Sequence, residues 1–416
     1  METFKLRDYQ IALAKKGLEL LKKHGVCYYA VQVRCGKTLT ALEVCKLYGA
    51  EKVLFLTKKK AIAGIEADYK NFEYTFDLKV TNYEQLGKFQ FDFDMVICDE
   101  SHCLGAYPKP SLRAKWLKSY VKNNPVIYLS GTPTPEGYSQ IYHQLWVNNN
   151  SPYRQYKNFY TWARDYVDVF QERRGIYMVN NYSRAKEERI KRDIAPIMLT
   201  YTQEAAGFNC PVTEHLLEVV DEQLPVLIRR LFKERILPFP AGACVAETPA
   251  ALMQKMHQLS GGSVICEDVI NNLPVRKAQI ISDSKAKFIK EYFQGKRIAI
   301  YYKFIAEKTI IKSQFPDATE SPEEFLEGKS NTFISQVLSG REGITLRTAD
   351  AIVFYSIDYS ATSYFQARAR LQDLRRDTPA EVYWIFLKGG IEKKVYQAVS
   401  AKIDFTYSYF RKHVIL

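Results

Sequence analysis

The chain has 416 residues, enough for two or three domains, and its composition of 47% hydrophobic and 25% charged residues is typical of a globular protein with sizeable cores. A formal net charge of +13 favours an anionic polymer as partner. Without an apolar stretch long enough to cross a bilayer, the sequence argues against a membrane partner. The eight cysteines have no C-x-x-C spacing, which predicts reduced thiols and a cytoplasmic or nuclear location.

A Gly-Lys-Thr sequence follows the first long apolar run of the chain. Residues 26–33 are predicted to form a buried strand and residues 39–48 a helix, so backbone N–H groups at a helix N-terminus would face an anion. Lys37 would reach the outer phosphates of a nucleoside triphosphate, and the Thr38 hydroxyl would bind Mg²⁺. Because Val31 stands where the usual pattern has its first glycine, an ordinary strand-to-helix turn remains an alternative. The predicted loop consists of Arg34, Cys35, Gly36, Lys37, Thr38 and Leu39.

An acidic pair follows a second short apolar run, residues 93–98. Asp99 would hold Mg²⁺ through its water shell, and Glu100 would orient and deprotonate an attacking water. A solvated strand end is the alternative for either residue alone. Because a Gly-Lys-Thr loop and an acidic pair occur in this order, each after a predicted parallel strand, we predict a triphosphatase that uses Mg²⁺.

Short apolar runs that alternate with helical patterns predict an α/β fold with two parallel sheets. The first sheet would lie in residues 1–134 and the second in residues 282–416. Residues 135–281 are rich in Tyr, Phe, Arg and Lys, and we predict a mostly helical insertion and linker there. Its aromatic side chains could stack on single-stranded bases or form a small core, and we favour the core. The predicted strands are residues 53–57, 95–98, 126–130, 297–302, 332–337, 351–355 and 382–387.

Several motifs resemble those of superfamily-2 helicases. Residues 6–10, Leu-Arg-Asp-Tyr-Gln, are similar to the adenine-reading Q-motif, and Ser-Gly-Thr-Pro at 130–133 is similar to motif III. Residues 339–344 resemble motif V, and Gln-Ala-Arg-Ala-Arg at 366–370 resembles motif VI. The order of these motifs resembles the Swi/Snf-type branch most closely. The resemblance runs from about residue 4 to residue 396 and implies two RecA-like domains that bind ATP.

The resemblance also implies roles for residues that the loop and the acidic pair do not account for. Arg7 and Gln10 would bind adenine, since an amide can pair with both a donor and an acceptor on its edge. Gly343 and Arg370 would complete the ATP site, with Arg370 as arginine finger and as a catalytic residue beside Lys37, Asp99 and Glu100. The family has a second arginine three residues further on, where this chain has Asp373.

Nucleic-acid contacts are implied at the family's contact motifs. Lys58 and Lys59 follow the predicted strand 53–57, where cations would meet phosphates, although a solvated turn is an alternative. The resemblance favours DNA over RNA, in single-stranded, duplex or branched form, and a monomer. The full set of predicted contacts is Lys58, Lys59, Thr81, Tyr83, Lys303, Ser339, Gly340 and Arg341.

These motifs together predict an ATP-dependent DNA helicase or translocase that acts in replication, recombination or repair. A duplex-DNA translocase or remodeller without strand separation is one alternative, and a non-motor clamp gated by ATP is another. Small helicase-like proteins of bacterial viruses often carry an R-x-G-K-T loop like residues 34–38. A viral source would make the location the host cytoplasm.

Overall fold

The structure is a computed structural model. It describes residues 5–88, 91–135, 137–174, 177–207, 212–270, 273–337, 346, 348–359 and 380–401. The chain forms two compact units, Met1–Phe208 and Asn209–Leu416, each with its own sheet and cores. None of the helices in the described part of the chain is both long and apolar enough to cross a membrane.

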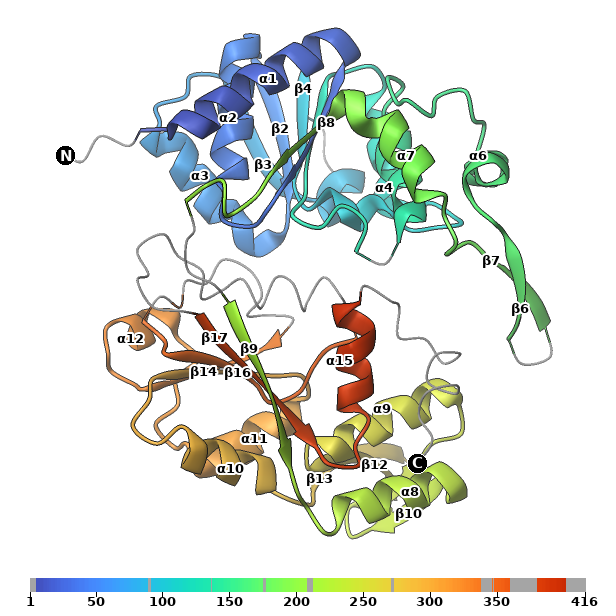
Figure 1. Ribbon diagram of the computed structural model, residues 1–416, viewed down its shortest axis with the longest axis vertical. Helices are drawn as coiled ribbons and strands as arrows, with labels where there is room; N and C mark the ends of the chain where they lie inside the picture. The colour runs from blue at the N-terminus through green and yellow to red at the C-terminus, as the bar shows by residue number, and fades with distance from the viewer. Residues whose placement is uncertain are drawn as a thin grey trace. The chain divides into compact units, whose positions relative to one another are not determined.

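A six-stranded parallel sheet organises the first unit (Figure 1). Its strand order is β3-β2-β4-β5-β1-β8, so a single strand, β5, separates β1 from β4. The strands are β1 (Val26–Val31), β2 (Lys52–Thr57), β3 (Asp77–Asn82), β4 (Met95–Cys98), β5 (Val126–Leu129) and β8 (Met198–Tyr201).

Helices cover both faces of this sheet. Alternate residues of β1 show the division, because Cys27 and Tyr29 belong to one buried cluster whereas Val26 and Tyr28 belong to the other. The first cluster is covered by α1 (Asp8–His24), α2 (Lys37–Tyr48) and α3 (Ile62–Asn71), and the second by α4 (Leu112–Val121), α5 (Ile141–Trp146), α6 (Phe159–Tyr166) and α7 (Glu187–Ile194). Short 3₁₀ turns are η1 (Lys59–Ala61), η2 (Tyr83–Lys88), η3 (Ser101–Leu104), η4 (Tyr138–Gln140) and η5 (Ala195–Ile197).

The second unit combines a parallel and an antiparallel sheet. The parallel sheet has the order β15-β14-β16-β17-β9, and the antiparallel sheet has the order β10-β11-β12-β13. Its strands are β9 (Val212–Val219), β10 (Ile236–Phe239), β11 (Gly242–Val245), β12 (Ser263–Ile270), β13 (Leu273–Ile280), β14 (Ile298–Tyr302), β15 (Thr332–Gln336), β16 (Ala351–Phe354) and β17 (Ala380–Leu387). Its helices are α8 (Leu224–Glu234), α9 (Pro249–Ser260), α10 (Ser284–Tyr292), α11 (Ile305–Gln314), α12 (Pro322–Leu326) and α15 (Glu392–Ser400). The prediction of an α/β fold with two parallel sheets is confirmed.

The segment between the predicted sheets is organised differently from the prediction. Residues 135–207 pack within the first unit and end in its edge strand β8, whereas β9 to β13, α8 and α9 belong to the second unit. The segment is also rich in strands rather than mostly helical. The reason is that β8 and β9 are completed by pairing with strands far away in the sequence, so their short patterns carry little local signal.

Most aromatic residues between Tyr138 and Tyr166 belong to a core, as we favoured, whereas Tyr160 is 45% exposed. Tyr142, Tyr153, Phe159, Trp162 and Tyr166 are each at most 4% exposed and lie in the same buried cluster. Trp162 stacks on Tyr166, with ring centroids 5.0 Å apart. Buried rings of this kind cannot act as stacking platforms for bases.

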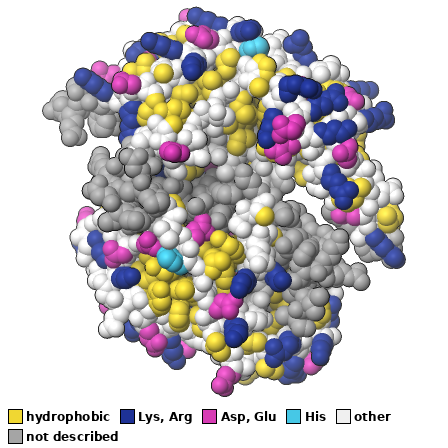
Figure 2. Space-filling view, viewed as in Figure 1, with side chains coloured by type: hydrophobic (Ala, Val, Ile, Leu, Met, Phe, Trp, Pro, Cys, Tyr) yellow, Lys and Arg dark blue, Asp and Glu magenta, His cyan; other side chains and the backbone are white. Residues whose placement is uncertain are grey.

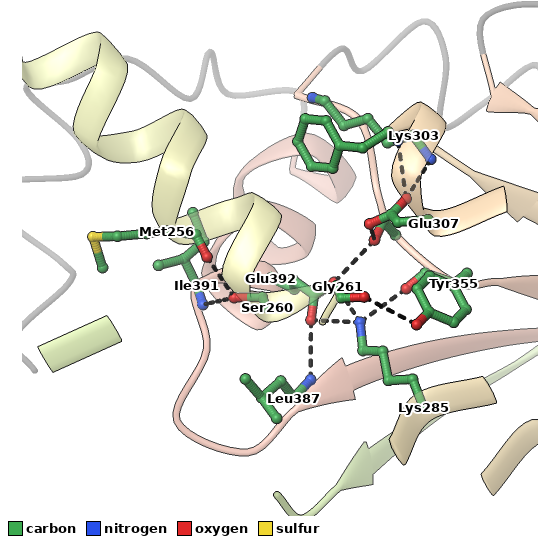
Figure 3. Close-up of polar contacts among 12 residues, drawn as sticks. Met256, Ser260, Gly261, Lys285, Lys303, Glu307, Tyr355, Leu387, Ile391 and Glu392 are labelled. Carbon is green, nitrogen blue, oxygen red and sulfur yellow. Dashed lines mark hydrogen bonds and ion pairs between the residues drawn. The ribbon is translucent and has the colours of Figure 1, made fainter. Parts of the chain in front are cut away.

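A buried polar network ties the elements of the second unit together (Figure 3). The Lys285 ammonium lies 2.6 Å from the Glu392 carboxylate, and it also donates to the Tyr355 carbonyl at 2.9 Å. Both charged side chains are at most 1% exposed. Ser356 donates to Glu307 at 2.5 Å, and Glu307 in turn accepts from the backbone N–H of Lys303 at 2.9 Å. The network therefore links α10, α11 and α15 to the ends of β14 and β16.

Candidate functional site

The predicted phosphate loop lies between β1 and α2. Gly36 precedes α2 in the left-handed conformation, with φ of 70°, and Arg34 also has a positive φ of 64°. A Cβ atom on Gly36 would lie 2.0 Å from Nε2 of Gln10. The backbone conformation therefore favours glycine at this position, and a Cβ there would displace the end of the Gln10 side chain. Cys35 is buried beside it, and burial raises the pKa of its thiol.

Lys37 is the first residue of α2 and turns back over the loop. Its ammonium donates to the carbonyls of Val31 at 3.0 Å and of Gln32 at 3.2 Å. The same ammonium lies 3.6 Å from the point where a Cβ on Gly131 would stand, which is van der Waals distance. The Ser-Gly-Thr-Pro sequence that includes Gly131 thus lies next to the loop lysine. Thr38 and Leu39 are half-buried in the first turn of α2.

Of the two predicted adenine-reading residues, Gln10 contacts the predicted phosphate loop directly and Arg7 contacts Gln10. Gln10 is 4% exposed, and its amide donates to the Gly36 carbonyl at 3.4 Å while accepting from the Arg7 backbone N–H at 2.9 Å. The Arg7 guanidinium donates to the Tyr9 hydroxyl at 3.1 Å, and the Tyr9 ring stacks on Tyr201 with centroids 4.8 Å apart. A shift of α1 would therefore change the hydrogen bond between Gln10 and the loop.

Asp99 follows β4 at the same edge of the sheet as the loop. Its carboxylate accepts from the Thr57 hydroxyl at 2.8 Å, and its carbonyl accepts from the Tyr83 hydroxyl at 2.7 Å. Burial, together with the adjacent Glu100 carboxylate, raises the pKa of Asp99 to about 6, whereas Thr57 and the charge of Lys37 act in the opposite direction. A carboxylate in this setting is stabilised by a nearby cation.

A chain of polar contacts joins Glu100 to the Ser-Gly-Thr-Pro sequence. Glu100 has a positive φ of 49°, a conformation that costs a non-glycine residue roughly 1–3 kcal/mol and often occurs at functional sites. Its carboxylate lies 3.3 Å from Nδ1 of His102, and the same nitrogen lies 3.1 Å from the Ser130 hydroxyl. Ser130 also accepts from the backbone N–H of Thr132 at 3.1 Å. The acidic pair and residues 130–132 are therefore mechanically connected.

The predicted nucleic-acid contacts in the first unit differ in their exposure to solvent. Lys58 and Lys59 follow β2 at this edge of the sheet, and Lys59 is exposed. Thr81 is 8% exposed and Tyr83 is 2% exposed. Because Tyr83 is packed in the core and holds the Asp99 carbonyl, its side chain supports the acidic pair and is not available to nucleic acid, contrary to the prediction.

In the second unit, Lys303 follows β14 and is engaged within the protein. Its ammonium lies 2.8 Å from the Asp358 carboxylate and 3.8 Å from the centre of the Tyr359 ring. The predicted residues Ser339, Gly340, Arg341, Gly343 and Arg370 lie outside the part of the chain that the structure describes.

Sequence reasoning missed residues that support the site from distant segments. Gln203, which follows β8, donates from its backbone N–H to the Gln32 side chain at 2.7 Å and from its amide to the Val33 carbonyl at 3.1 Å. Thr57, at the end of β2, holds the Asp99 carboxylate. The position of Thr57 at the end of a predicted strand was a usable signal, whereas Gln203 had none.

The chain is similar in sequence to the CHD3-type chromatin-remodeling factor PICKLE of Arabidopsis thaliana. The two are 22% identical over 386 residues, which is 83% of this chain, and the chain spans 26% of the length of that relative. The resemblance to the Swi/Snf-type branch of superfamily 2 that the motifs predicted is confirmed by this match.

Solved structures with similarity to the chain include the SWI2/SNF2 ATPase core of Sulfolobus solfataricus in complex with dsDNA. That comparison covers 99% of this chain and 93% of the other, at 16% identity and a TM-score of 0.43. The core domain from the same organism gives 14% identity and a TM-score of 0.42, over 100% of this chain and 92% of that one. No protein-family model matches the chain.

Proposed function

We propose that this chain is a DNA-dependent ATPase that uses ATP and Mg²⁺ to translocate along duplex DNA. The observation that carries the proposal is the meeting of Lys37, Asp99 and Gly131 at one edge of a parallel sheet. This edge is where open α/β sheets bind their ligands. The similarity to a chromatin-remodeling factor supports DNA as the partner.

The residues of the first unit fit a bound Mg²⁺ and triphosphate. No group of three or more His, Cys, Asp or Glu side chains that could hold a metal occurs among the described residues. Mg²⁺ in such sites needs only one or two protein ligands, because phosphates and waters supply the others. Asp99 and the Thr38 hydroxyl suffice, and the raised pKa of Asp99 marks a carboxylate whose charge a cation would stabilise. When bound, Mg²⁺ would neutralise charge on the phosphates.

Each residue then has a role that its contacts support. The Lys37 ammonium would exchange its two carbonyl partners for phosphate oxygens. Glu100 would accept a proton from the attacking water, and His102 would keep the Glu100 carboxylate in position. Because His102 also contacts Ser130, the state of the acidic pair would be transmitted to residues 130–132. The roles of Gly343 and Arg370 stay predictions.

Release of inorganic phosphate tests the proposal. We expect duplex DNA to raise ATP turnover of the wild-type chain, and we expect Glu100→Gln to lose turnover while still binding ATP. A wild-type chain that binds ATP and duplex DNA but releases no phosphate would instead be the non-motor clamp. RNA in place of DNA is the matched comparison for the choice of nucleic acid.

Helicase activity needs a separate measurement. We propose translocation without strand separation, because the sequence similarity is to a remodelling factor. Displacement of the third strand of a triplex reports translocation, whereas displacement of a labelled strand from a forked duplex reports unwinding. Activity in the second assay would assign the chain to the helicases.

A further inference from the structure

A two-stranded antiparallel ribbon stands apart from the sheets of the first unit (Figure 1). It consists of β6 (Phe170–Arg174) and β7 (Tyr177–Asn181), which pair with each other and with none of the other described strands. A two-stranded ribbon is marginally stable by itself, so its stability depends on its attachment to the rest of the unit and on contacts with a partner.

The base of the ribbon is fixed to the core of the unit. Val167 and Ala185 form a β-bridge, and the Lys186 backbone N–H donates to the Tyr166 carbonyl at 2.7 Å. The Arg189 guanidinium lies 4.4 Å from the centre of the Tyr166 ring and donates to the Asp165 carbonyl at 3.0 Å. Because α6 and α7 hold both ends, the ribbon projects from a rigid base.

The two faces of the ribbon differ. On one face the Arg184 guanidinium covers the Phe170 ring at 4.0 Å, and the Asn181 amide donates to Glu172 at 2.7 Å. The other face is formed by the register pairs Gln171–Asn180 and Arg173–Met178. All four of these side chains are exposed. We call this set of Gln171, Arg173, Met178 and Asn180 the outer face.

Each face of the ribbon carries an exposed apolar side chain. Met178, on the outer face, is 57% exposed, and Tyr177, on the opposite face, is 70% exposed. Figure 2 shows basic and apolar side chains together on this projection. The charged residue of the outer face is Arg173, and from Asp168 to Lys186 the chain has four Lys or Arg residues against two acidic ones, which favours an anionic partner.

We propose that the outer face of the ribbon is inserted into the major groove of duplex DNA. This inference rests on the proposed function and names the element that engages the duplex. The major groove is about 12 Å wide and admits a two-stranded ribbon. Arginine, glutamine and asparagine are the side chains that bond base edges there, and arginine also bonds phosphates. The methionine contributes apolar contact to thymine methyl groups.

Binding of a blunt duplex to the full chain, measured by fluorescence anisotropy at several salt concentrations, tests the proposal. We expect the triple variant Gln171→Ala, Arg173→Ala and Asn180→Ala to bind about tenfold or more weakly. Arg173→Ala alone should flatten the dependence of log K on log salt by about one. The matched control is Arg276→Ala, because this arginine is also exposed on a strand, with 77% of its side chain accessible, but lies in the other unit.

Two further measurements test whether the ribbon enters the major groove and whether the triple variant is folded. The wild-type chain should protect guanine N7 in the major groove from methylation, and the triple variant should lose that protection. ATP hydrolysis without DNA should be unchanged in the triple variant, which shows that it folds. Equal duplex affinity in wild type and triple variant, an equal loss in the Arg276 control, or protection confined to the minor groove would each overturn the proposal.

The outcomes separate this inference from the proposed function. If the triple variant keeps the stimulation of ATP hydrolysis by DNA, the ribbon proposal fails and the ATPase stands. If the wild-type chain shows ribbon-dependent protection of the duplex but hydrolyses no ATP, the motor assignment fails and the ribbon stands. A ribbon that is needed for forked DNA but not for a blunt duplex would contact a strand junction instead, which also overturns the major-groove proposal.

Discussion

Replacement of Asp99 by asparagine should stabilise the nucleotide-free protein while abolishing ATP hydrolysis. The reason is that Asp99 is partly buried next to another carboxylate, so its charge is costly when no cation is bound. Asparagine keeps an oxygen that can accept from the Thr57 hydroxyl. The substitution therefore removes the unfavourable charge and retains the hydrogen bond.

The size of the effect follows from the pKa of Asp99, which is raised from 3.8 to about 6. If solvent screening is ignored, this difference in pKa corresponds to about 3 kcal/mol of folding free energy, since one pKa unit is about 1.4 kcal/mol. The carboxylate keeps some access to solvent, so we expect about 1–2 kcal/mol. In a domain of this size that gain raises Tm by about 2–8 °C.

The sign of the pH dependence is fixed by the direction of the shift. A raised pKa means that the native state holds the proton more tightly, so wild-type stability falls as pH rises from about 4 to about 6. The advantage of Asp99→Asn should be largest above about pH 6.5 and should disappear near pH 4.

Thermal unfolding across this pH range is the assay, and Asp92→Asn is the control. Asp92 is also a carboxylate, but its side chain is 91% exposed. We expect the control to change Tm little at any pH. A lower Tm for Asp99→Asn at neutral pH, or a gain that does not depend on pH, would refute the reasoning.

Four further substitutions have expected outcomes. Gly36→Ala should lower stability by about 1–3 kcal/mol, whereas Gly49→Ala, which has a similar φ of 78° but nothing within 4 Å of its Cβ, should cost only about 1 kcal/mol, as chemical denaturation can measure. Lys285→Ala should cost about 3–5 kcal/mol in the same measurement, because it leaves the Glu392 carboxylate buried without its cation. Ser130→Ala should slow ATP hydrolysis by about tenfold with little change in ATP affinity, and an unchanged rate would show that its contact with the acidic pair is only structural.

Local signals were sufficient to predict that residues 34–39 connect a buried strand to a helix. Only residues 32–36 separate the buried strand from the helix, so each residue from Arg34 to Leu39 could be placed relative to these two elements. The contact of Ser130 with His102 follows from the same kind of signal, because each residue comes shortly after a strand and these two strands, β5 and β4, are neighbours in one sheet. Where the strands are strongly apolar, the sequence therefore predicts which residues lie at the same edge of a parallel sheet.

Contacts that depend on distant pairing were not predictable. Gln203 supports the loop only because β8 pairs with β1, about 170 residues earlier in the chain. Tyr83 looked like a nucleic-acid contact, but the turn after β3 directs its ring into the core. The division of residues 135–281 between the two units has the same origin, since β9 is defined by its pairing with β17. In each case the decisive neighbour is remote in sequence.

Phosphate release by wild type and Glu100→Gln, with and without duplex DNA, tests the central claim most directly. The account predicts turnover that duplex DNA stimulates in the wild-type chain, and turnover that is lost in Glu100→Gln although ATP still binds. Equal turnover in the two proteins would contradict the catalytic assignment and with it the proposed function.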